Sequence, residues 1–462
     1  MIVIAFLLLI AYTFLVGFVL KKSFVGEAFY FLCYLLYFLP FYTTFQLIVF
    51  QGTEQELLVH LLRYSKDLVI LMAFIIFLFG SRTSLSQQTW QLRPLDKLMA
   101  LFMGLVALYM LLPLGTASFF SKLVYARQTF LIGIVYFFGR NTLINPERWA
   151  WVRRTLSFLA LLAFGLALAE YLGGVHLHQL LGYGQYNRVF NEVLPTGHYG
   201  LSWTFERSGG IPRYAAYFAD PLEFSASLLL FISLALYRLY QPRAGGLSWA
   251  DLTFFTLLIA CFLMAGSRAS TLAAFGIILF ALFLHRSYQW LRWLFFSGLL
   301  LTAYLWWFAS EDTLYFLWDS LLLADTSSLG HLIEWLAGID SMLQDPLGIG
   351  LAMSGNAGAV DQRFSIGGEN QFLIYGVQMG VAGLLVYVLL LFRSIRDSLT
   401  VFRRTTQEYI RSMAHMAALT KLALLIPLLT ANAELYLFVS LFSWFMVGHV
   451  QQYLPKEIPP KD

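Results

Sequence analysis

The chain has 462 residues, of which 59% are hydrophobic and 12% are charged, and its mean hydropathy is +0.70. A typical soluble protein carries about 25% charged residues, so this composition excludes a soluble enzyme, a nucleic-acid-binding protein and a disordered scaffold. Apolar runs of membrane-spanning length indicate an all-α integral membrane protein, in which the positions of the 30 basic and 26 acidic residues matter more than their balance.

About thirteen transmembrane helices are predicted, and twelve to fourteen fit the pattern. Their approximate ranges are 2–20, 28–50, 68–80, 98–114, 123–139, 155–171, 223–239, 251–266, 270–285, 294–309, 371–392, 415–430 and 433–449. Lys21 and Lys22 follow the first apolar run instead of preceding it, so we interpret this run as a retained helix and not as a signal peptide. Residues 1–462 are expected to form one polytopic domain that ends in a cytoplasmic tail, 451–462.

The basic residues of the loops predict the orientation. One set of alternate loops holds 20 Lys and Arg residues and the other set holds 8, which places the richer set in the cytoplasm and the amino terminus outside. Two long loops, 172–222 and 310–370, then lie on the outer side. Both are rich in Gly, Pro, charged and aromatic residues, so we expect them to fold over the membrane surface and shape a site.

Five arginines are predicted to lie near the outer surface: Arg127 within a span, Arg207 and Arg213 in the first long loop, Arg268 at a tight turn, and Arg363 in the second loop. Ionisable groups at membrane depth are costly and usually functional. Because a guanidinium donates two parallel hydrogen bonds to phosphate, their convergence would suit an anionic ligand. Arg268 could instead be an interfacial anchor, whereas the restrained backbone around Arg213 favours function.

Structural interpretations of two arginines stay open. Arg127 could pair with an intramembrane acid such as Glu434, and Arg207 could pair with Glu206 or Glu192 as a solvated surface charge. In either case the guanidinium would be neutralised and unavailable to a ligand.

The acidic candidate is Glu369, which precedes Asn370 at the outer start of the span 371–392. A carboxylate there meets the positive end of the helix dipole, which would explain it structurally. It also has the depth needed to accept a proton from a hydroxyl at the membrane surface, so a catalytic role is equally open. Asp220, which precedes Pro221, is fully explained as a helix cap.

No metal site or cofactor is predicted. His331, Glu334 and Trp335 fit one face of a short amphipathic helix in the second loop, whereas His176 and His178 do not share a helical face. Cys33 and Cys261 have no metal-ligand spacing, and the chain contains no P-loop, GxGxxG, HExxH or GxSxG motif.

Three stretches together resemble the superfamily of bacterial O-antigen ligases and Wzy-type polysaccharide polymerases. They are LMAGSRASTLAA (263–274), IPRYAAYFADPLEFSASLLL (211–230), and HLIEWLAGIDSMLQDPLGIG (331–350) with ENQFLIYGVQMGVAGLLVYVLLL (369–391). Each motif is loose alone, but their order and spacing are more specific, and the resemblance covers roughly residues 120–395.

The resemblance implies a GT-C-like, metal-independent glycosyltransferase of the bacterial inner membrane, with its site facing the periplasm. Its donor would be an oligosaccharide on undecaprenyl pyrophosphate, and no cofactor is implied. By position, Arg213 and Arg268 would bind the pyrophosphate, with Arg127 as a third member. The secondary substrate-binding candidates are Arg207, Arg363, Asn370, His331 and Tyr214.

Glu369 departs from the ligase pattern, in which His is usual at this place, and looks more like the polymerases. We therefore predict a polysaccharide polymerase with Glu369 as the base or acceptor orienter. The alternative is an O-antigen ligase acting on lipid A–core. A flippase or transporter is less favoured, because internal repeats and broken helices are not evident in the sequence. The expected partners are lipid-linked oligosaccharide, membrane lipids and a chain-length regulator, with no nucleic acid.

Overall fold

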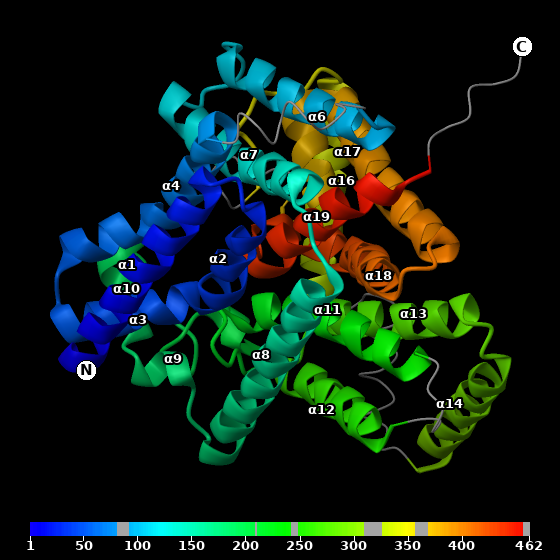
Figure 1. Cartoon of the computed structure of the whole chain (residues 1–462). Coiled ribbons are helices and arrows are strands. Elements are labelled where there is room, and N and C mark those ends of the chain that lie inside the picture. The colour runs from blue at the N-terminus through cyan, green and yellow to red at the C-terminus, as the bar shows by residue number, and fades with distance from the viewer. Residues whose placement is uncertain (81–91, 208–209, 242–247, 309–325, 356–367, 456–462) are drawn as a thin grey trace, which may run out of the picture.

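The chain folds into a bundle of helices with one small sheet among the residues described here, which are 1–80, 92–207, 210–241, 248–308, 326–355 and 368–455 of a computed structural model (Figure 1). The helices of the first half are α1 (Ile2–Phe24), α2 (Phe31–Tyr37), α3 (Tyr42–Thr53), α4 (Glu56–Gly80), α6 (Pro94–Leu111), α7 (Phe119–Asn141), α8 (Pro146–Gly173), α9 (Leu177–Leu180) and α10 (Tyr183–Phe190). Those of the second half are α11 (Pro221–Tyr240), α12 (Trp249–Ala265), α13 (Arg268–Leu284), α14 (Tyr288–Phe308), α16 (Thr326–Gln344), α17 (Gln371–Arg404), α18 (Glu408–Thr430) and α19 (Leu437–Val450).

Short elements complete the fold. The 3-10 helices are η1 (Ala28–Tyr30), η2 (Leu39–Phe41), η3 (Trp203–Phe205), η5 (Ala433–Leu435) and η6 (Gln451–Tyr453). The sheet consists of β1 (Glu206–Arg207) and β2 (Ile211–Pro212), which pair antiparallel with Arg207 opposite Ile211.

Eight helical segments of the described chain are long and apolar enough to cross a membrane, which confirms the predicted class of a helical, multi-pass membrane protein in that coarse form. They are Ile2–Phe24, Ala28–Thr53, Pro94–Leu111, Pro146–Gly173, Pro221–Tyr240, Tyr288–Phe308, Gln371–Arg404 and Glu408–Thr430. The five other predicted spans coincide with α4, α7, α12, α13 and α19. Of these, α12 and α13 have 17 residues each and α19 has 14, while α4 and α7 carry charged side chains, so the number thirteen stays a prediction.

The centre of the bundle is α19, which is buried along nearly its whole length between α7, α11 and α18. A pair of glycines allows the close approach of α7 and α19. A Cβ on Gly139 would lie 2.0 Å from the carbonyl oxygen of Phe445, and one on Gly448 would lie 2.1 Å from that of Tyr136. Small residues at helix crossings commonly serve this purpose in membranes. Helices α1 and α14 lie outside this core and expose apolar side chains.

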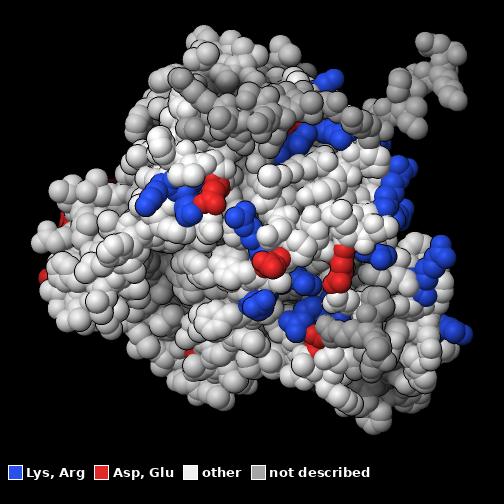
Figure 2. All heavy atoms as spheres, viewed as in Figure 1, with Lys and Arg blue, Asp and Glu red and all other residues white. Residues whose placement is uncertain are grey.

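Several contacts join segments that the sequence assigns to the same side of the membrane. On the predicted cytoplasmic side, Glu27 bridges Lys22 and Arg148, and Arg93 donates to the carbonyl oxygen of Leu454. The face seen in Figure 2 shows far more Lys and Arg than Asp and Glu side chains. On the predicted outer side, the first long loop packs on other helix ends, as Arg63 shows by donating to the carbonyl oxygen of Phe190.

One helix is broken, which the sequence did not predict. Gly380 interrupts α17 with φ 69° and ψ −172°. The segment that follows α16 fills the break: the amides of Ile349 and Gly350 donate to the carbonyl oxygens of Val377 and Gln378, at 2.9 and 3.1 Å. The turn DPLGIG is therefore bonded into the interior of the bundle, because the break frees carbonyl groups that need partners away from water.

Candidate functional site

Three arginines from separate segments converge where the first long loop meets the turn between α12 and α13. Arg207 lies in β1, Arg213 directly follows β2, and Arg268 is the first residue of α13. Backbone hydrogen bonds fix the loop there, since the amide of Arg213 donates to Phe205 at 2.8 Å and that of Tyr214 donates to Met264 at 3.1 Å. We call Arg207, Arg213 and Arg268 the arginine cluster.

A glycine makes room for the first member of the cluster. Arg207 lies across Gly266 and donates to the carbonyl oxygen of Leu263 at 3.3 Å. A Cβ on Gly266 would lie 2.4 Å from the guanidinium Nη2, and the φ of +64° is a left-handed conformation that favours glycine. The turn AGSRAS thus positions two arginines at once: it carries Arg268 and supports Arg207.

Positive charge is crowded in the arginine cluster. Burial, together with the like charges of Arg207 and Arg268, lowers the pKa of Arg213 to about 10, and the nearby Asp220 carboxylate opposes that shift. The Nε atom of Arg213 is buried and makes no hydrogen bond to any described residue. The guanidinium still stays charged at neutral pH, so a bound anion would relieve both the repulsion and the unmet donor.

Carboxylates lie beside the cluster. Asp220 caps α11, as predicted, by accepting from the amides of Leu222 and Glu223 at 2.7 and 2.8 Å. Burial raises the pKa of Asp220, while these two amides and the charge of Arg213 counteract part of the shift. The charges of Asp220, Glu223 and Glu369 all act on the phenol of Tyr436, in the turn before α19. Glu369 therefore lies within electrostatic range of the same phenol as Asp220 and Glu223.

The start of α17 presents Glu369. Asn370 is the helix cap, and its Oδ1 accepts from the amides of Phe372 and Leu373 at 3.0 and 3.2 Å. This capping accounts for the buried Asn370 without a ligand. Glu369 is half-buried, one residue before the cap, where the helix dipole favours its negative charge.

The amphipathic helix predicted in the second loop exists as α16, and it brings His331 toward this region. His331 Nδ1 lies 3.9 Å from Glu334 Oε2. A Cβ on Gly368 would lie only 1.9 Å from that Glu334 oxygen. Glu334 therefore packs directly on the residue that precedes the candidate base, Glu369, and His331 lies beside Glu334.

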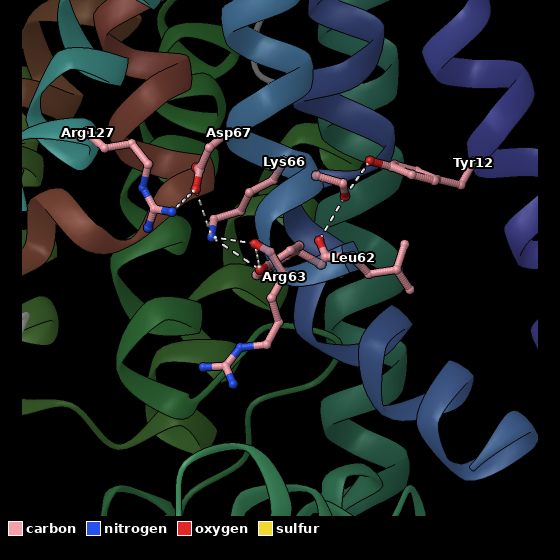
Figure 3. A network of polar contacts seen from close by, with 8 residues as sticks. Tyr12, Leu62, Arg63, Lys66, Asp67 and Arg127 are labelled. Carbon is pink, nitrogen blue, oxygen red and sulfur yellow. Dashed lines mark hydrogen bonds and ion pairs between the residues drawn. The ribbon is translucent and has the colours of Figure 1, made fainter. Parts of the chain in front are cut away.

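Arg127 lies in a different charge environment (Figure 3). Its Nη1 makes a 3.1 Å ion pair with Asp67 Oδ2, and Lys66 Nζ lies 3.8 Å from the same oxygen. Lys66 also donates to the hydroxyl of Tyr42 at 3.2 Å and interacts with the charge of Glu223. Arg127 is therefore paired, as one interpretation held, but with an acid of α4 and not with Glu434.

The remaining predicted residues have structural contacts. Tyr214 is buried, with its ring 5.2 Å from that of His176. Lys122, in the first turn of α7, donates to the carbonyl oxygens of Leu112 and Leu114, at 2.7 Å each, and so satisfies the end of α6. Arg363 lies outside the described residues.

The proposed surface pair of Arg207 with Glu206 is not formed. Glu206 Oε2 lies 2.7 Å from His198 Nδ1, because neighbouring residues of a strand point to opposite faces. Glu206 is buried whereas Arg207 is exposed.

Glu434, which the sequence offered as a partner of Arg127, belongs instead to a second buried ionic group with Lys421. Glu434 accepts from Tyr387 at 2.8 Å, from Trp444 Nε1 at 3.2 Å and from Ser440. Lys421 Nζ lies 4.0 Å from Glu434 and 3.7 Å from the ring centroid of Trp444. Charged residues are rare in these apolar spans, and this rarity could have drawn attention to both side chains. The sequence does not show, however, which residues they contact.

Neither the arrangement of metal-ligating side chains nor the comparison with known proteins assigns a function. Within the described part of the chain, no three His, Cys, Asp or Glu side chains are placed to hold a metal ion. No protein-family model matches the chain, and no curated protein sequence matches it.

Proposed function

We propose that the protein is a polysaccharide polymerase that transfers a glycan from undecaprenyl pyrophosphate to a hydroxyl of another lipid-linked repeat unit. The observation that carries this proposal is the convergence of Arg207, Arg213 and Arg268. The half-buried Glu369 acts on the same phenol, that of Tyr436, as the Asp220 carboxylate that influences Arg213. Crowded guanidinium groups suit a pyrophosphate, and a carboxylate beside them suits proton removal from an acceptor.

In the proposed reaction, the acceptor hydroxyl oxygen attacks the anomeric carbon of the donor glycan. The bond between that carbon and the pyrophosphate oxygen breaks, and its electron pair leaves with the pyrophosphate. The arginine cluster stabilises the departing charge, and Glu369 receives the hydroxyl proton. Since pyrophosphate is already a good leaving group, the main contributions of the protein are charge stabilisation and positioning.

The finer assignments belong to the same proposal. The protein would have thirteen spans in a GT-C-like arrangement in a bacterial inner membrane, with the arginine cluster on the periplasmic side and a chain-length regulator as a partner. Arg127 is left out of the pyrophosphate site, because Asp67 already neutralises it. His331 and Glu334 would position Glu369 through the backbone at Gly368.

Polymer formation tests the proposal. Purified full-length protein is incubated with a lipid-linked repeat unit and EDTA, and the products are separated as a ladder on a gel. Wild type should give a ladder, whereas Glu369→Gln, Arg213→Ala and Arg268→Ala should not, although they elute as folded protein.

Two results would replace the proposal. Transfer only when lipid A–core is supplied would make the protein a ligase. Movement of the intact lipid-linked repeat unit across a vesicle membrane, without new glycosidic bonds, would make it a flippase. The broken helix α17 does not by itself favour transport, since the segment 345–354 occupies its free carbonyl groups.

A further inference from the structure

An apolar groove lies along α7, with α4 on one side and α6 on the other, and both of these helices pack against α7 (Figure 1). Its volume is about 500 Å³, which is within the usual range of ligand-binding pockets. Leu71 and Phe74 line it from α4, and Met99 and Met103 line it from α6. An apolar cavity of this kind excludes water and accepts an apolar ligand.

The two ends of the groove differ in polarity. Helices α6 and α7 run antiparallel here, because Asp96 at the start of α6 meets Arg140 at the end of α7, with 3.4 Å between Asp96 Oδ2 and Arg140 Nε. At the other end, Met103 lies against Gly133, where an added Cβ would be 2.9 Å from the Met103 sulfur. The groove is therefore apolar around Met99 and Met103 and charged around Asp96 and Arg140.

The length of the groove matches one leaflet of a bilayer. On α7 its lining extends from Phe130 to Asn141. A helical rise of about 1.5 Å per residue gives this stretch a length of about 16 Å. Half of a hydrocarbon core of about 30 Å is about 15 Å. The charged end belongs to the side that the basic loops assign to the cytoplasm, so a lipid chain of that leaflet has the length to occupy the groove.

Positive charge prevails at the polar end. The first turn of α6 and the last turn of α7 carry three basic residues, Arg93, Lys97 and Arg140, and one acid, Asp96. Asp96 accepts hydrogen bonds from the hydroxyl of Tyr136 and the backbone amide of Arg93, at 2.5 and 2.7 Å, whereas Lys97 is exposed. Basic residues next to a membrane attract the anionic lipids of the cytoplasmic leaflet.

We propose that the groove binds one acyl chain of an anionic phospholipid, with the phosphate of the headgroup at the polar end near Lys97 and Arg140. The apolar lining accounts for the chain, the length of the groove accounts for one leaflet, and the basic residues account for the charge of the headgroup. This inference does not depend on the proposed transferase function, and its test involves no measurement of transfer.

Lipid binding tests the groove directly. Full-length protein purified in detergent is titrated with palmitoyl-oleoyl phosphatidylglycerol, and native mass spectrometry counts the retained lipid. Wild type should retain one molecule. Ala100→Phe, which fills the groove from α6, should raise the dissociation constant at least about tenfold, because the exclusion of about two methylene groups has this effect. Ile134→Trp fills the groove from α7 and repeats the test where Ala100→Phe disturbs folding.

Ala303→Phe is the matched control for these variants. Ala303 is exposed on α14 and does not line the groove, so this substitution adds the same side chain to a different apolar surface. The dissociation constant of phosphatidylglycerol should stay unchanged in Ala303→Phe.

The headgroup is tested with phosphatidylcholine of the same acyl chains, which carries no net charge. Wild type should bind phosphatidylglycerol at least about fivefold more tightly, the effect of about one basic residue at a membrane surface. Arg140→Gln should remove most of this preference. Lys97→Gln, which leaves the ion pair of Arg140 with Asp96 intact, should also reduce it.

Three results would overturn the lipid site. The first is a dissociation constant that neither Ala100→Phe nor Ile134→Trp changes, or that Ala303→Phe raises equally. The second is equal binding of phosphatidylglycerol and phosphatidylcholine by wild type. The third is a wild-type dimer without bound lipid that Ala100→Phe converts to a monomer, which would assign the groove to a second copy of the chain.

Discussion

The arginine cluster and the Arg127–Asp67 pair each contain one partly buried guanidinium group, that of Arg213 and that of Arg127, yet the charge environments of these two groups differ. Arg213 faces Arg207 and Arg268, and its pKa falls to about 10 by burial and by their repulsion. Arg127 instead makes a 3.1 Å ion pair with Asp67. Neighbouring positive charges thus disfavour the charged form of Arg213, whereas the carboxylate of Asp67 stabilises the charge of Arg127.

The charges that surround a guanidinium group therefore help to identify an anion-binding site. The depth of the arginine in the membrane does not provide this information. All of these arginines satisfy the sequence criterion of lying near the predicted outer surface, but only their neighbours reveal which positive charges are already neutralised. Arginines that repel one another lower the stability of the fold and gain most from an anion. Four substitutions can break or sharpen this contrast, and they follow in order of decreasing effect.

Replacing Arg213 should separate function from stability. Arg213→Gln should lower the transfer rate by about 10²- to 10³-fold, the usual effect of removing one preorganised donor from a developing charge. The melting temperature should stay equal or rise, because repulsion is relieved. Inorganic pyrophosphate should raise the melting temperature of wild type but not of Arg213→Gln, and Arg127→Gln should retain this response. A pyrophosphate response that is lost in Arg127→Gln and retained in Arg213→Gln would show that the anion binds at Arg127 and not at the arginine cluster.

Replacing Asp67 should affect stability. Asp67→Asn leaves Arg127 and Lys66 without their carboxylate and should cost about 3 kcal/mol of unfolding free energy, as for broken buried ion pairs. Heating followed by size-exclusion chromatography gives the midpoint. The double variant Asp67→Asn, Arg127→Gln should recover most of the loss. An Asp67→Asn variant as stable as wild type would show that the Arg127–Asp67 ion pair does not stabilise the fold.

Gly266→Ala tests the support under Arg207. The added Cβ meets the guanidinium at 2.4 Å in a left-handed turn, so we expect a cost of about 1–2 kcal/mol and weaker pyrophosphate binding. Gly276→Ala, in the neighbouring α13 with open space around its Cα, is the matched control and should be neutral or slightly stabilising. Equal behaviour of the two variants would contradict the assigned role of Gly266.

The histidines under the first long loop predict a small pH effect. Burial lowers the pKa of His178 to about 4, so the folded state holds it neutral while the unfolded chain protonates near its usual value of about 6.5. Its contribution is therefore present above pH 6.5 and is lost as pH falls toward 4. His178→Phe should shrink the fall in melting temperature between pH 7.5 and about 5.8, by about 1 kcal/mol in unfolding free energy. An unchanged fall would exclude His178.

Much of the secondary structure was readable from the sequence. Every predicted span coincides with a helix, because unbroken apolar runs have one solution in lipid, namely a helix that satisfies its own backbone. Local signals also placed the Asp220 cap and the amphipathic helix around His331. The break in α17 was missed, since Gly380 is one glycine among many and only the contact with the turn at 346–350 requires its left-handed φ.

The sequence by itself determined the membrane class, the helix ranges and the residues rare enough at that depth to be suspected. Only the tertiary structure decided which arginines meet one another and which meet an acid. Asp67 neutralises Arg127 from a helix far away in the chain, and Arg213 joins Arg207 and Arg268 through the α12–α13 turn. Hydrophobicity and helix caps act over a few residues, whereas the charge balance of a buried group depends on every element that packs around it.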